Sequence, residues 1–163
     1  MIVFISIVSF FLDGILSKYI SLNSIFLPLF TIVSLVIIYP YFNNNIYRYL
    51  KFVAIIGILY DITYLNTVFF NFFIFMILGI IICFINYLLS VNLYSIILTT
   101  SISIIMYRLI IFLFVLFFKN HDLNFLNLLV MISKSLILNI IYSIIIYLMS
   151  ESYSNKKNIL RAK

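Results

Sequence analysis

Long apolar runs separated by short polar breaks form the main pattern of this sequence. Four runs cover about Met1–Ser17, Ile25–Phe42, Leu93–Phe118 and Leu123–Met149. A membrane-spanning helix needs about 20 mostly apolar residues, so each of these runs predicts one span. The breaks after them, such as the three asparagines at 43–45, predict short connections.

A fifth apolar stretch, Phe52 to Leu89, is too long for one span. At about 1.5 Å per residue it would extend roughly 57 Å, nearly twice the thickness of the hydrocarbon layer. A cluster of polar residues at Asp61, Thr63, Asn66 and Thr67 is the best place for a turn. The pattern therefore predicts a third span at about 46–62 and a fourth at about 68–89.

Composition agrees with a membrane protein. Of 163 residues, 66% are hydrophobic and 9% are charged, and the mean hydropathy is +1.30. Soluble domains are about half apolar and about a quarter charged, so a cytosolic enzyme or a nucleic-acid-binding domain is excluded. The predicted fold class is all-α, a polytopic integral membrane bundle of six transmembrane helices over residues 1–150 with a basic cytoplasmic tail over 151–163.

The net charge of +6 is distributed as membrane orientation requires. Lys156, Lys157, Arg161 and Lys163 lie in the tail, and Arg48 and Lys51 follow the break at 43–45. Basic residues stay on the cytoplasmic side of a membrane. Six spans would place both basic clusters on that side, so we expect both termini in the cytoplasm and no nucleic-acid partner.

The sequence contains no pattern typical of catalysis. The single cysteine, Cys83, lies in an apolar run, and the single histidine, His121, lies in a predicted loop beside Asp122. Neither has the spacing of a metal site, and no nucleophile has a base within reach. We therefore expect no enzyme activity, no metal and no cofactor.

Charged side chains within the predicted spans are the candidate functional residues. They are Asp13, Asp61, Arg108 and Lys134, and Asn139 adds a polar group to the last span. Charges within a membrane are costly and usually face a bundle interior or a wet cavity. Two acids and two bases in the outer half of one bundle predict pairing across helices. For Asp61 we favour a pair with Lys134 or Arg108, and the alternative is an exposed cap at a helix end.

Polar residues accompany the two basic ones. Ser101 and Arg108 share one face of the fifth span, with Thr100, Ser103 and Tyr107 beside it. Asn127, Met131, Lys134 and Leu138 form a stripe on the sixth, with Ser135, Asn139 and Tyr142 adjacent. Two interpretations remain open: a polar cavity or partner-contact seam, and interhelical hydrogen bonds that only hold the bundle together.

The stretch from Phe52 to Tyr64 resembles the signature of MreD, the rod-shape-determining membrane protein family of bacteria. That family carries a Gly-x-Leu-Tyr-Asp-like sequence at the end of a span, and Gly57, Leu59, Tyr60 and Asp61 match it. More loosely, Asn71 fits a polar position in the next helix, and Phe10–Gly14 and Leu138–Ile140 resemble segments of the first and last spans. The family usually has a glycine eight residues after the aspartate, where this chain has Phe69.

The resemblance implies a non-enzymatic scaffold of the cell-elongation machinery in the bacterial cell membrane. Its partners would be an MreC-like protein and, through it, an MreB-like filament and the elongation peptidoglycan synthases. MreD is also distantly similar to the S-components of energy-coupling-factor transporters, which bind a small vitamin. That alternative function is disfavoured because S-components dock through small residues in the first span, often Ala-x-x-x-Ala, and this span has no alanine.

Overall fold

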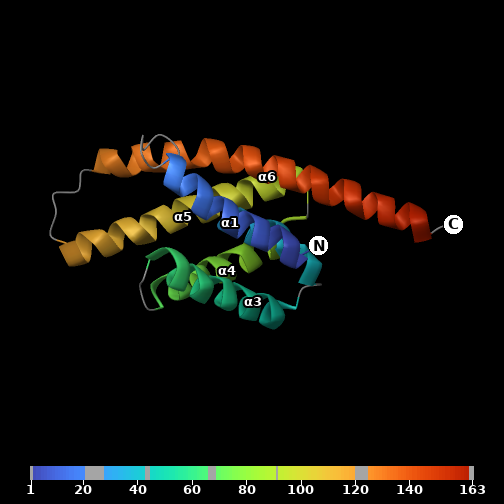
Figure 1. Cartoon of the computed structure of the whole chain (residues 1–163), viewed down its shortest axis with the longest axis horizontal. Coiled ribbons are helices and arrows are strands. Elements are labelled where there is room, and N and C mark those ends of the chain that lie inside the picture. Colours follow the sequence, from blue (N-terminus) through green and yellow to red (C-terminus); the bar gives the residue numbers. More distant parts are fainter. Residues whose placement is uncertain are drawn as a thin grey trace.

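The computed structural model describes residues 2–20, 28–42, 45–65, 69–90, 92–119 and 125–161. Within these residues the chain is all-helical apart from short connections, as the apolar pattern predicts. Six α-helices form a bundle in which successive helices run in alternating directions (Figure 1). They are α1 (Ile2–Ile20), α2 (Phe30–Ile38), α3 (Ile46–Tyr60), α4 (Phe70–Leu88), α5 (Leu93–Lys119) and α6 (Phe125–Arg161).

Three of these helices are long and apolar enough to cross a membrane. They cover Phe70–Leu88, Leu93–Phe117 and Leu128–Glu151. Two further apolar helices, Phe4–Leu16 and Phe30–Phe42, are shorter. The fourth and fifth expected spans thus correspond closely to α4 and α5, and the structure is that of a helical protein with membrane-spanning character.

The second expected span differs most from the structure. Residues 25–27 lie outside the described part, and α2 begins only at Phe30. It continues as a 3₁₀-helix over Tyr39–Phe42. The two segments together rise about 20 Å, less than the roughly 30 Å of a hydrocarbon layer. The expectation of a full-length span over Ile25–Phe42 is therefore not confirmed in the described part, where the apolar helix covers Phe30–Phe42.

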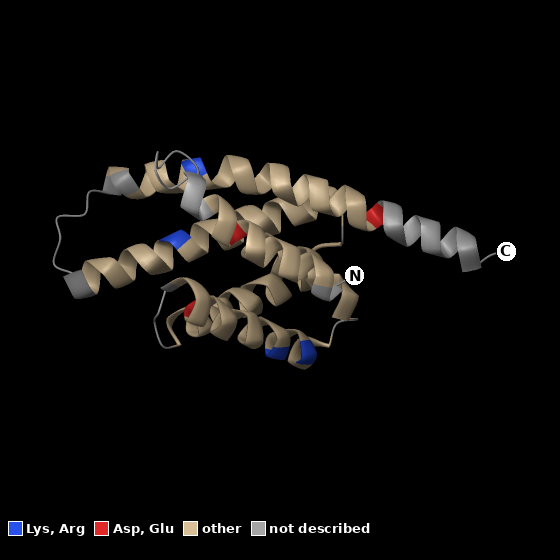
Figure 2. Cartoon of the chain, in the orientation of Figure 1, with Lys and Arg blue, Asp and Glu red and all other residues tan. Residues whose placement is uncertain are grey.

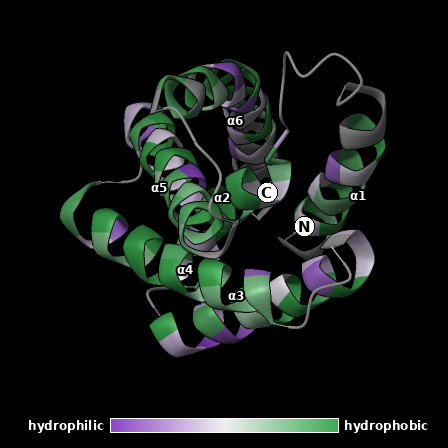
Figure 3. Ribbon diagram, turned by 90° about the vertical axis from the view of Figure 1, so that its left-hand side faces the viewer, coloured by the Kyte–Doolittle hydropathy of each residue, from purple (hydrophilic) through white to green (hydrophobic). Residues whose placement is uncertain are grey.

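Helix α2 is the centre of the bundle. Every residue from Phe30 to Ile38 is buried, and the end-on view places α2 among the other helices (Figure 3). Its sequence is apolar on all sides, which is typical of a fully buried helix. Thr31 and Ser34 are its two polar residues, and Ser34 bonds the carbonyl of Thr31 within the helix.

The predicted turn within 52–89 is confirmed. Helix α3 ends at Tyr60 and passes into a π-helical turn, Asp61–Leu65, and α4 starts at Phe70. Asn66 and Thr67, two of the four residues that predicted this turn, lie outside the described residues. The connection folds α4 back against α3.

Both ends of the described chain lie toward the same end of the bundle (Figure 1). Helix α3 begins at that end too, so exposed Arg48 and Lys51 are placed there. Most other charged positions occur singly along the helices (Figure 2). Helix α6 continues without a break from the bundle to Arg161, so the described part of the expected tail is an extension of this helix.

Candidate functional site

Asp13 lies about two turns before the end of α1 and caps α2 from the side. Its carboxylate accepts hydrogen bonds from the backbone N–H groups of Phe30, at 2.6 Å, and Thr31, at 2.8 Å. The Thr31 hydroxyl donates a third at 2.5 Å. The first N–H groups of a helix have no partner within it and carry partial positive charge, so a carboxylate is well suited to this place. Asp13 is 2% exposed and fully satisfied by these contacts.

Asn139 of α6 completes the same cap. Its Oδ1 accepts the backbone N–H of Leu29 at 2.9 Å, and its Nδ2 donates to the carbonyl of Ser135 at 2.6 Å. Pro28 precedes Leu29 and has no N–H group to satisfy. The start of α2 is therefore bound from two sides, by α1 and by α6, at a point inside the bundle.

Asp61 repeats this arrangement in the second hairpin. Its carboxylate accepts the N–H of Asn71 at 2.9 Å and that of Phe72 at 3.0 Å, both in the first turn of α4. The Asn71 side chain donates to the same carboxylate at 3.1 Å. Asp61 is 2% exposed and Asn71 is fully buried. In each hairpin, an acid caps the start of the second helix: Asp13 lies within α1, and Asp61 lies in the turn directly after α3.

The described hydrogen bonds of Asp61 are made with the start of α4, and neither Lys134 nor Arg108 is among these partners. The hairpin brings Asp61 directly to the α4 N–H groups, and these supply the positive charge that we had assigned to a basic side chain. The alternative for Asp61 was an exposed cap at a helix end. Asp61 does cap a helix end, but it is buried and not exposed.

Gly57 allows α3 and α4 to approach closely just beside Asp61. A Cβ atom at this position would lie 2.9 Å from the Cα atom of Phe72. Backbone atoms cannot move aside as a side chain can, so this contact requires glycine. Of the other signature residues, Tyr60 packs against Phe75 of α4, with ring centroids 5.4 Å apart, and Leu59 is exposed.

Phe69 has an unusual backbone conformation. It precedes α4 with φ 64° and ψ 10°, the left-handed region. Glycine adopts this region at little cost, and a bulky residue does not. This is the position at which the MreD family usually carries glycine.

A polar chain continues from Asp61 into α5. The Tyr107 hydroxyl, which is buried, donates to Oδ1 of Asn71 at a long 3.4 Å. The Arg108 guanidinium lies 6.0 Å from the Tyr107 ring, and its Nε is buried with no hydrogen-bond partner among the described residues. Thr100 and Ser103, the residues predicted beside this face, are fully buried. The fifth span thus presents its polar side to the interior.

The sixth span buries a different stripe from the one centred on Lys134. Lys134 is half-buried and Met131 is exposed, whereas Ser135, Asn139 and Ser143 are fully buried. The two serines bond carbonyls of their own helix. The interior face of α6 is therefore the one that carries Ser135 and Asn139, which we had placed beside the stripe of Lys134. Asn127 lies in α6, but its side chain falls outside the described residues.

Taken together, these groups hold helices in place. The carboxylates of Asp13 and Asp61 have their described hydrogen bonds with helix N-terminal N–H groups and with the side chains of Thr31 and Asn71. Within the described residues no three His, Cys, Asp or Glu side chains are grouped as a metal site. Sequence reasoning had missed the role of Asn139 on α2, although Pro28 and Thr31 mark a helix start that needs a partner. His121 lies outside the described residues.

Three comparisons with known proteins found no match to this chain. No model of a protein family matches this chain, and searches of curated proteins and of solved structures found no match. The functional argument therefore depends on the residues of the site.

Proposed function

We propose that this chain is an MreD-like integral-membrane scaffold of the bacterial cell-elongation machinery. It would cross the cell membrane with six helical segments and keep both termini in the cytoplasm. It would act through contacts with an MreC-like protein and, through it, with an MreB-like filament and the peptidoglycan synthases. It would carry out no reaction of its own.

The observation that carries this proposal is the shared role of the signature residues. Gly57 lets the α3 and α4 backbones approach, Tyr60 packs against α4, and Asp61 caps its start. A scaffold needs a fixed arrangement of helices, and this set of residues supplies one. The left-handed backbone at Phe69 adds support, since glycine would be favoured there.

The outer face of α1 argues against the vitamin-transport alternative. Its exposed residues are large and apolar: Phe4, Ile7, Phe11 and Ile15. Close helix docking uses small residues, because they let two backbones approach. A surface of Phe and Ile does not allow that kind of docking.

Depletion of the protein in its own host tests the proposal. We expect rod-shaped cells to become rounded, with mislocalised wall synthesis, and wild-type protein supplied from a plasmid should restore the shape. Gly57→Leu should fail to restore it, and Ile55→Leu, an exposed change on the same helix, should succeed. Normal cell shape on depletion, together with lost uptake of one vitamin, would overturn the scaffold function in favour of transport.

A further inference from the structure

A groove lies where the start of α3 meets the end of α4, at the end of the bundle that holds both termini. It has a volume of about 700 Å³. Its apolar walls include Ile46 of α3 and Ile80 and Phe84 of α4, which are all exposed, and Tyr39 and Cys83 are the buried residues at its base. The groove is therefore open to the surroundings of the bundle, and neither of the two helix caps belongs to it.

The polarity of this groove changes along α4. Ile80 is about two turns from Asn86 and Tyr87, the lining residues nearest the end of the helix. Tyr87 is 86% exposed, and tyrosines are enriched where the hydrocarbon layer of a membrane meets water. The groove thus leads from that boundary, at Asn86 and Tyr87, into the apolar layer, at Ile80.

A positive charge lies beside the polar end of the groove. Lys51 is exposed on α3, and its Nζ lies 4.4 Å from the centre of the Tyr47 ring. This contact brings the ammonium group back toward the start of α3, where Ile46 lines the groove. Arg48 is also exposed at this end of the bundle (Figure 2). It points away from the groove, because two residues along a helix turn the side chain by about 200° from that of Ile46.

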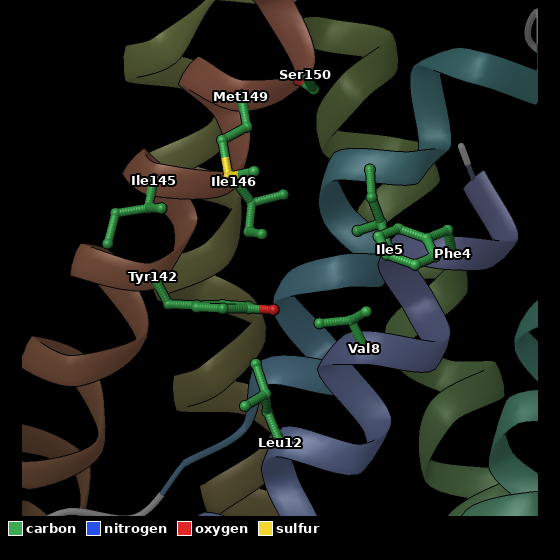
Figure 4. Close-up of a pocket in the computed structure, with 9 residues that line it drawn as sticks. All are labelled: Phe4, Ile5, Val8, Leu12, Tyr142, Ile145, Ile146, Met149 and Ser150. Carbon is green, nitrogen blue, oxygen red and sulfur yellow. The ribbon is translucent and has the colours of Figure 1, made fainter. Parts of the chain in front are cut away.

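The acids that the structure describes lie elsewhere. Asp13 and Asp61 cap helices, Glu151 belongs to α6, and none of the three lines this groove. A second groove, between α1 and α6, has a different charge at its edge (Figure 4). Its lining ends at Ser150, and the next residue is the exposed acid Glu151. An anionic group is therefore favoured at the groove between α3 and α4 and not at the second one.

The length of the groove between α3 and α4 favours a lipid over a partner helix. It extends about 10 Å along α4, from Ile80 to Tyr87. The hydrocarbon layer is about 30 Å thick, so the groove stays within one leaflet. A phospholipid is also confined to one leaflet, with its charge at the water boundary and its chains in the apolar layer. Most of a spanning partner helix would lie outside the groove.

We propose that this groove binds an anionic phospholipid, with one acyl chain against Ile80 and Phe84 and the phosphate beside Lys51. Basic pockets between helices at a membrane surface bind anionic headgroups by the same attraction. The lipid belongs to the leaflet on the side of both termini and joins the start of α3 to the end of α4. This site is separate from the Gly57–Asp61 hairpin and does not depend on the scaffold function.

The headgroup is tested with the full chain in nanodiscs of phosphatidylglycerol and phosphatidylcholine at one to three. Native mass spectrometry after release is expected to find phosphatidylglycerol retained in preference to phosphatidylcholine. Lys51→Gln should lower this preference about fivefold. Arg48→Gln removes the same charge from the other side of α3 and should lower the preference less. Equal losses in the two variants, or no loss in Lys51→Gln, would overturn the assignment of the headgroup.

The acyl chain is tested by filling the groove. Ile80→Trp places a large ring in it and should reduce the amount of retained phosphatidylglycerol. Ile77→Trp places the same ring on an exposed position of α4 outside the lining and should leave retention unchanged. Ile146→Trp fills the second groove (Figure 4) and should also leave it unchanged. Equal retention by folded Ile80→Trp and wild type, or loss of retention only in Ile146→Trp, would overturn the proposal.

Photocrosslinking of the wild type covers the case in which Ile80→Trp does not fold. A phosphatidylglycerol with a diazirine on one acyl chain should label the peptide spanning 80–87, and a phosphatidylcholine with the same probe should label it less. Labelling confined to other surfaces would overturn the proposal. So would a co-purified membrane protein that covers residues 80–87 in place of lipid, because the occupant would then be a partner helix.

Discussion

Asp61 is buried beside two backbone N–H groups, and these neighbours determine how it responds to substitution. Asp61→Asn removes the charge that the start of α4 favours and replaces one accepting oxygen with a donor. We expect it to lower the free energy of unfolding in detergent by about 2 kcal/mol. The Asp61→Lys variant should not accumulate as folded protein. Adding Lys134→Asp or Arg108→Asp should not restore its level. Recovery of the protein level in either double variant would contradict the capping role and support the ion pair.

Gly57 faces the backbone of α4, so a methyl group there forces the two helices apart. We expect Gly57→Ala to lower the free energy of unfolding by about 1–3 kcal/mol, as overpacking does. Gly79→Ala is the matched control, because its Cβ would meet side-chain atoms of Leu50 and Val53 and no backbone atom. Thermal unfolding in detergent compares the two. Equal stability of both variants would show that the α3–α4 contact tolerates a side chain.

Phe69 has a left-handed backbone that a side chain disfavours by about 1–2 kcal/mol. Phe69→Gly should therefore raise the free energy of unfolding, by about 1 kcal/mol, even though it removes an aromatic ring. Phe73→Gly is the control: this residue is similarly exposed but lies within α4. There glycine should be destabilising by about 1 kcal/mol. The same sign for both substitutions would exclude the left-handed conformation.

At the scale of an element, α2 is held by the side chains of its neighbours. Asn139→Ala leaves the Leu29 N–H group buried without this acceptor, which costs about 1–3 kcal/mol. Ser143→Ala removes a hydroxyl whose bond is made within α6, to Ile140, and should cost less than 1 kcal/mol. Hydrogen exchange at the start of α2 should accelerate in Asn139→Ala and not in Ser143→Ala. Unchanged hydrogen-exchange rates in both variants would show that Asp13 alone holds the start of α2.

At the scale of the whole molecule, the alternating helices predict where each connection lies relative to the membrane. In a Cys83→Ser background, we expect a membrane-impermeant thiol reagent to label cysteines at Ser24 and Asn120 from outside intact cells. Cysteines at Asn44 and Asn155 should react only after the cells are opened. External labelling of Asn155 would overturn the proposal that both termini lie in the cytoplasm.

The sequence by itself determined the fold class and most helix positions. Helices α4 and α5 follow directly from apolar run lengths, and the turn after Asp61 follows from a stretch too long for one span. These features depend on local composition and on the solvent that such a composition requires. For the same reason, the sequence also identified Asp13, Asp61 and Asn139 as costly polar groups within apolar helices.

Only the tertiary structure decided what those groups bind and which helix is central. A sequence lists side-chain charges, but the N–H groups at the start of a helix are also positive and appear nowhere in such a list. Asp61 meets them because the hairpin brings α4 back to it. Likewise, the start of α2 is held by Asp13 and Asn139, which are more than 100 residues apart in the sequence and meet only at this helix end. A partner that exists only after folding cannot be counted from residue types, and this is why the sequence pointed to basic side chains as partners of Asp61 and not to the start of α4.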